Sequence, residues 1–136
     1  FILSIQETSN NESTFMVIGD GTSQPTIQNI DPKLKQGKEI FMSNCAACHA
    51  INKQLTGPAL AGIEERVPNK KILYAWIKNN EQVLKSGNKY FTNLYNTYNK
   101  TPMNIFSNLT DEDIDAILFY INAQREFIGL PIASTL

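Results

Sequence analysis

The first helical pattern of apolar residues in this chain begins at Asp31. Asp31 is expected to cap the helix and Pro32 to lie in its first turn, where the missing N–H of proline costs no hydrogen bond. Small or apolar residues then follow three or four positions apart, at Leu34, Gly37, Phe41 and Cys45. This spacing predicts a helix that starts near residue 31 and runs to residue 45.

The last helical pattern carries the clearest start signals in the chain. Thr110 with Asp113 three residues later resembles a capping box, and Leu109 and Ile114 suit a hydrophobic staple across the helix start. An apolar face then recurs at Ile114, Ile117, Leu118 and Ile121. We therefore predict a final helix that begins directly after Thr110.

Two shorter stripes of apolar residues lie between these helices and predict two more. The first consists of Ile72, Leu73, Trp76 and Ile77; the second follows a break at Gly87 and consists of Tyr90, Phe91, Leu94, Tyr95 and Tyr98. Residues 31–136 are thus predicted to form one all-α domain of about four helices with long loops. Such a domain often needs something besides side chains in its core. Residues 1–30 are polar and poor in charge, and we expect them to form an extended or weakly ordered arm; a strand or hairpin at the β-prone run of residues 14–18 is the alternative.

Composition narrows the class of protein. The chain has 136 residues, with 12 Lys and Arg against 13 Asp and Glu, so its charge is nearly balanced. This balance argues against nucleic acid or a strongly anionic membrane as the partner. No apolar run approaches the roughly 20 residues that cross a bilayer. The opening FILSI, without Met or basic residues, suggests a trimmed end left by a signal peptide or a membrane anchor.

Both cysteines and the only histidine lie in the segment NCAACHA, residues 44–50. A structural zinc site needs four ligands; no fourth Cys or His follows Cys45, Cys48 and His49, so only a carboxylate would complete the set. A redox dithiol would be expected beside a βαβ pattern, and the sequence has none. Cysteines and a histidine that merely fill the core are also disfavoured, because Cys48 and His49 are immediate neighbours. The order C-x-x-C-H is the haem attachment signature: two thiols on one turn add to the porphyrin vinyl groups, and His49 then lies below the iron.

A haem iron held by His49 needs a second axial ligand or an open site. Because the chain has no other histidine, methionine is the candidate, and a His/Met pair raises the reduction potential. Met42 is too close to Cys45 to reach round the macrocycle, and Met16 belongs to the N-terminal arm. Met103 lies in a loop between two predicted helices and is the expected ligand; the alternative is that it only fills the core.

Four segments carry a resemblance to a known family: GKEIFMSNCAACHA (37–50), TGPALAGI (56–63), LYAWIKN (73–79) and TPMNIFSNLTDEDIDAILFYI (101–121). With these, the chain resembles the class I c-type cytochromes, especially the bacterial monohaem kind, over roughly residues 33–125. The resemblance implies the cytochrome c fold around one covalently bound haem c. It also implies that Gly37 and Phe41 cross the last helix at Ile117 and Tyr120.

The resemblance further implies roles around the haem. The carbonyl of Pro58 should accept a hydrogen bond from the free ring nitrogen of His49, which fixes the orientation of the imidazole. Trp76 should pack beside the haem and donate its N–H to a propionate, although packing alone explains it nearly as well. Residues 82–100 are longer than in small relatives and should add a helix at the propionate edge, with Tyr90, Tyr95 and Tyr98 filling the core.

Together these features predict one-electron transfer by a His/Met-ligated haem c, not an enzyme. The chain would act as a monomeric periplasmic carrier, or as a tethered domain, between a quinol-oxidising complex and a terminal oxidase or reductase. The loop departs from many relatives, because Pro102 precedes Met103 and Asn104 follows it. This departure leaves an alternative open, a haem enzyme or sensor whose weak or open sixth site binds peroxide or a diatomic gas.

Overall fold

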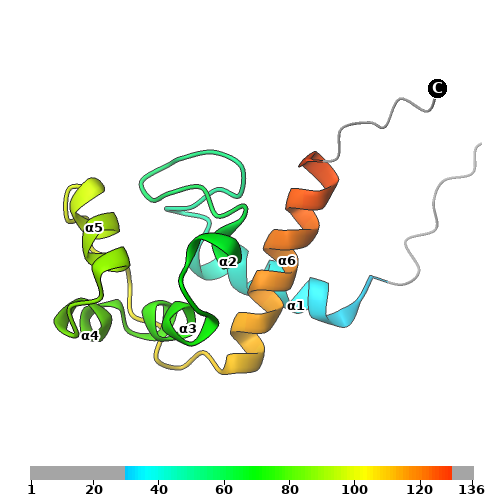
Figure 1. Cartoon of the computed structure of the whole chain (residues 1–136). Coiled ribbons are helices and arrows are strands. Elements are labelled where there is room, and N and C mark those ends of the chain that lie inside the picture. Colours follow the sequence, from blue (N-terminus) through cyan, green and yellow to red (C-terminus); the bar gives the residue numbers. More distant parts are fainter. Residues whose placement is uncertain (1–29, 130–136) are drawn as a thin grey trace, which may run out of the picture.

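The computed structural model describes the backbone of residues 30–129 and the side chains as far as Arg125. The predicted arm at residues 1–30, Met16 included, thus lies outside the described residues except for Ile30. Within the described range the structure is helical, without strands (Figure 1). Their order is α1 Pro32–Asn44, α2 Ile63–Arg66, α3 Lys70–Lys78, α4 Asn80–Lys85, α5 Lys89–Thr97 and α6 Asp111–Gly129.

Helices α1 and α6 form the main helix pair, and they cross in Figure 1 as the resemblance implied. Gly37 is buried at the crossing, where a Cβ atom would stand 1.9 Å from the carbonyl oxygen of Ala116. Beside it, the rings of Phe41 and Tyr120 pack with their centroids 5.4 Å apart. A glycine at this position therefore lets the two backbones touch while aromatic rings fill the flank.

The start of α6 has the predicted capping box. The N–H of Asp113 donates to the Thr110 hydroxyl at 3.1 Å, and the N–H of Thr110 donates to the Asp113 carboxylate at 2.9 Å. These hydrogen bonds to Thr110 hold the pKa of Asp113 below its ordinary value. The predicted apolar face of α6 is buried throughout: Ile114, Ile117, Leu118 and Ile121. Capping and burial thus agree with the sequence pattern.

The four predicted helices are all present, as α1, α3, α5 and α6, and α5 lies within the stretch expected to add a helix. Helices α2 and α4 are additional. Each is at most two turns long, too short for a helical periodicity to show in the sequence. None of the helices in the described range is long and apolar enough to cross a membrane.

Candidate functional site

The C-x-x-C-H segment forms one tight turn at the end of α1. Cys45 is the residue that ends the helix, and its carbonyl accepts hydrogen bonds from the N–H groups of Cys48 at 3.1 Å and His49 at 2.9 Å. The two cysteines do not form a disulfide; Cys45 is half-buried and Cys48 is exposed. The turn therefore holds the two thiols and the imidazole of His49 on one short piece of backbone.

The same geometry disfavours the alternatives weighed from the sequence. Burial raises the pKa of the Cys45 thiol to about 11, so a free thiol here stays protonated and is a poor nucleophile. The attacking cysteine of a redox dithiol needs a lowered pKa, so Cys45 is unsuited to that role. For zinc, no three His, Cys, Asp or Glu side chains within residues 30–125 are placed to hold a metal ion.

His49 is oriented by the loop that follows the motif. Its Nδ1 lies 3.0 Å from the carbonyl oxygen of Pro58, as the resemblance implied. The N–H of Gly57 donates to the carbonyl of Cys48 at 2.8 Å, which ties this loop to the motif turn. When Nδ1 donates its hydrogen to Pro58, Nε2 keeps its lone pair and can bind a metal.

Gly57 supports the imidazole ring from the loop side. A Cβ at Gly57 would stand 2.4 Å from Cε1 of His49, far inside van der Waals contact. We therefore expect Gly57→Ala to displace the ring and to weaken its hydrogen bond to Pro58. Exchange of the Nδ1 hydrogen with solvent, followed by NMR, should be about tenfold faster, as for a hydrogen bond weakened by roughly 1.4 kcal/mol.

Lys53 is exposed in the same loop region, and Lys53→Ala is the control for this substitution. It should leave the exchange rate of the Nδ1 hydrogen unchanged. A wild-type exchange rate in Gly57→Ala would show that the ring does not depend on the space beside this glycine.

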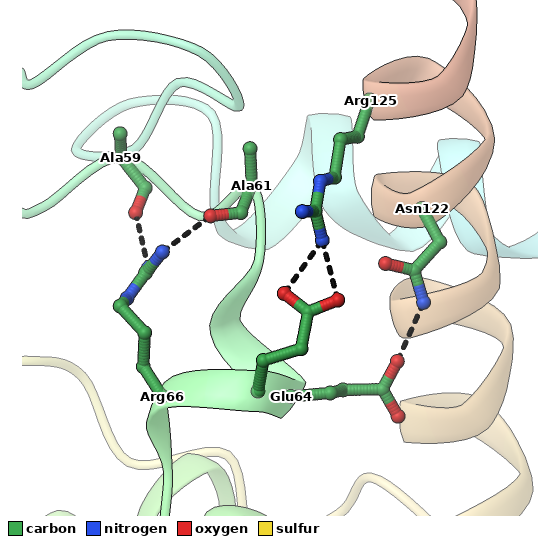
Figure 2. Close-up of polar contacts among 7 residues, drawn as sticks. Ala59, Ala61, Glu64, Arg66, Asn122 and Arg125 are labelled. Atoms are coloured by element: carbon green, nitrogen blue, oxygen red, sulfur yellow. Dashed lines mark hydrogen bonds and ion pairs between the residues drawn. The ribbon is translucent and has the colours of Figure 1, made fainter. Parts of the chain in front are cut away.

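Helix α2 anchors the loop that carries Pro58, which the sequence did not indicate. Figure 2 shows Arg66 reaching the carbonyl oxygens of Ala59, at 2.8 Å, and Ala61. The same helix is joined to α6 by two contacts: Glu65 to Arg125 at 2.6 Å, and Glu64 to Asn122 at 2.5 Å. The carbonyl that faces His49 is thus supported through α2 by α6.

All six predicted site residues line one cavity: Cys45, Cys48, His49, Pro58, Trp76 and Met103. Most of the remaining lining is apolar and comes from several helices and loops, including Leu60, Ile63, Leu73, Ile77, Phe91, Leu94, Phe106, Ile117, Leu118 and Ile121. The motif turn and the Met103 loop, which are far apart in the sequence, therefore line the same cavity.

The aromatic residues divide between packing and lining. Trp76 stacks on Phe91 at a centroid distance of 4.2 Å, and Tyr90 meets the same ring edge-on at 5.0 Å. Tyr90 therefore packs against the core, as predicted. Tyr95 and Tyr98, also predicted to fill the core, are half-buried and line the cavity. Helix α5 is thus one wall of the cavity.

The loop that carries Met103 is held by a residue that sequence reasoning missed. The side-chain amide of Asn80 donates to the carbonyl oxygens of Met103 at 2.9 Å and Asn104 at 3.1 Å. Asn80 is 3% exposed and is the one buried polar side chain of the described range. In the sequence it is only the second asparagine of a pair whose first member, Asn79, caps α4.

The donor set of the cavity fits a covalently bound haem. Two thiols one turn apart suit the two vinyl groups, an oriented imidazole suits the iron, and the apolar lining suits the macrocycle. The thioether of Met103 offers a second soft ligand for iron.

The comparisons with known proteins agree with this chemistry. A family model described as Cytochrome c matches residues 34–124. Among solved structures, a cytochrome c from Rhodothermus marinus is 26% identical with a TM-score of 0.55, and the match covers 75% of this chain and 86% of that one. An engineered cytochrome c from Rhodothermus marinus, bound to a carbene intermediate, is 25% identical with a TM-score of 0.53 over 75% and 87% of the two chains.

No curated protein gives a significant match. The family model and the two solved structures nevertheless agree on one kind of protein, and the motif turn, the oriented His49 and the apolar cavity supply its chemistry. The chain therefore belongs to the cytochrome c family of haem-based electron-transfer proteins, and its cofactor is one haem c attached through Cys45 and Cys48.

Proposed function

We propose that the protein transfers single electrons with His49 and Met103 as the two axial ligands of its haem iron. The observation that supports this proposal is that Met103 lines the same cavity as Cys45, Cys48 and His49, although it comes from a distant loop. When bound, haem supplies an iron that gains and loses one electron. Two such protein ligands would leave no open coordination position for a substrate.

The residues of the chain have separate tasks in this proposal. His49 would bind the iron through Nε2, and the Pro58 carbonyl, 3.0 Å from Nδ1, fixes the orientation of the imidazole and raises its basicity. Met103 would contribute a thioether, which favours the reduced state and so would raise the reduction potential. The apolar lining excludes water, and this lower polarity tunes the same potential.

The proposed setting is the bacterial periplasm, because haem is normally attached to C-x-x-C-H segments outside the cytoplasmic membrane. There the protein would be a monomeric carrier or a tethered domain. We propose a respiratory quinol-oxidising complex as its electron donor and a terminal oxidase or reductase as its acceptor. The nearly balanced charge of the chain suits weak, fast encounters without strong electrostatic steering.

The absorption spectrum of the oxidised holoprotein tests the proposed ligation. Methionine sulfur bound to ferric haem gives a weak far-red band, which we expect to observe together with slow binding of cyanide to the oxidised protein and of carbon monoxide to the reduced protein. A spectrum without this band, together with rapid binding of both small molecules, would instead support the haem enzyme or sensor with an open sixth site.

A further inference from the structure

We propose that Asn80 is the positioning residue that keeps the Met103 loop closed over the haem, and so determines how firmly Met103 is retained as a ligand. This inference rests on the proposed function, since it takes Met103 to be the second axial ligand. It adds a residue outside the family motifs to the site, and it gives the α3–α4 junction a role in the strength of the iron–sulfur bond.

The hydrogen bonds of Asn80 converge on the ligand residue. A side-chain amide has two N–H hydrogens, and the structure aims its nitrogen at two successive carbonyls, those of Met103 and Asn104. Both donors are therefore used on two successive peptide groups, the one that joins Met103 to Asn104 and the one that follows it. The amide fixes the direction in which the backbone presents the Met103 side chain.

Little else holds this stretch of chain. In the described structure, the hydrogen bonds from Asn80 are the only ones that reach the backbone of residues 102–105. Pro102, Asn104 and Ile105 are exposed, and the stretch has no regular secondary structure. The next attachment is at Phe106, whose N–H donates to the carbonyl of Lys78 at 3.1 Å. Without the side-chain amide of Asn80, residues 102–105 would therefore be held only at the two ends of the segment.

The position of Asn80 in the fold makes it a firm support. Asn80 is the first residue of α4, and Asn79 performs the capping task by accepting from the N–H of Gln82 at 3.2 Å. The amide of Asn80 is thus free for the loop. Because Asn80 is 3% exposed and both hydrogen bonds are partly buried, a side chain without donors would leave two carbonyls that no other protein group pairs in the described structure.

The test compares haem-loaded Asn80→Leu with the wild type. Leucine has a similar size but no donor, so the loop should release Met103 more often. We expect a weaker far-red band in the oxidised protein, a lower reduction potential and cyanide binding about tenfold faster, in line with the loss of two partly buried hydrogen bonds. Asn80→Ser keeps one hydroxyl donor, and its cyanide rate should lie between those of the wild type and the leucine variant.

Asn69→Ala is the matched control. Asn69 is also an asparagine at a helix start, where its side chain accepts from the N–H of Ile72 at 2.9 Å, but it does not contact the Met103 loop. It should lower thermal stability while leaving the band, the potential and the cyanide rate near their wild-type values. Cyanide binding accelerated equally by the control would reduce Asn80 to a general stabilising role and overturn the proposal.

Two further outcomes separate this inference from the proposed function. Wild-type band intensity and cyanide rate in Asn80→Ser would overturn the role of Asn80, even where the leucine variant fails to take up haem. If at the same time Met103→Ala loses the band, the His49/Met103 ligation stands and only the inference fails. A Met103→Ala protein that keeps the band would remove the ligation, and the inference with it.

Discussion

Replacing Met103 with alanine should abolish the far-red band of the oxidised protein and lower its reduction potential by on the order of 0.1 V, a fraction of the span that axial ligands control. The thioether favours the ferrous state, so a water molecule or an empty position in its place favours the ferric state. The cavity should also open to small molecules, and cyanide should bind at least about a hundredfold faster, as when a barrier of some 2.7 kcal/mol is removed. Absorption spectra, potentiometric titration and stopped-flow mixing with cyanide measure these three effects.

Met42→Ala provides the control within the same chain. Met42 is 58% exposed on α1 and does not line the cavity, so its replacement should change neither the band nor the potential. An unchanged spectrum and potential in Met103→Ala would assign the second ligand to another group. Equal changes in both variants would indicate a general effect of losing a methionine.

Sequence patterns predicted the parts of the site that depend on residue type and local spacing. The C-x-x-C-H order placed Cys45, Cys48 and His49 on one turn, because a turn is determined by neighbouring residues. The caps at Asp31 and Thr110 are equally local, and both are present in the structure. The contact between Pro58 and His49 required the resemblance, since nothing in the spacing alone shows that this carbonyl meets the ring.

Arg66 and Asn80, which hold the loops of Pro58 and Met103, could not be predicted from sequence patterns. Arg66 and Asn80 act on backbone carbonyls, and every residue carries such a carbonyl, so the pairing leaves no trace in residue types. The tertiary fold determines which carbonyls these side chains meet, because it places α2 beside the Pro58 loop and the α3–α4 junction beside the Met103 loop. A buried asparagine is informative only after its burial is known.

The loops held by Arg66 and Asn80 also differ in how many other hydrogen bonds restrain them. Arg66 holds a loop that is joined to the motif turn by backbone hydrogen bonds, such as Gly57 N–H to Cys48 at 2.8 Å, so His49 has several independent restraints. The Met103 loop has no comparable backbone link between residues 102 and 105 in the described structure. Met103, the proposed second ligand, is therefore the residue that a single substitution should loosen most easily.

The largest effect on stability is expected from Gly37→Ala. On an exposed helix this change normally stabilises by about 1 kcal/mol, because alanine is the better helix former. At Gly37 the added Cβ would stand 1.9 Å from the carbonyl oxygen of Ala116 and 3.0 Å from Cβ of Tyr120. The first of these neighbours is backbone, so α1 and α6 must separate, and the free energy of unfolding should fall by about 3 kcal/mol or more.

Urea unfolding of the holoprotein measures this loss, and Gly87→Ala is its control. Gly87 has a φ of +75° with no atom near its missing Cβ, so alanine there adds backbone strain of about 1 kcal/mol without a collision. The two variants thus separate backbone strain from a collision between helix backbones.

Because α1 ends in the motif turn and α6 supports α2, separation of these helices at Gly37 also moves Cys45 relative to the Pro58 loop. Gly37→Ala should therefore lower haem incorporation as well as stability, whereas a Gly37→Ala protein as stable as the wild type would mean that the helices do not touch at this residue.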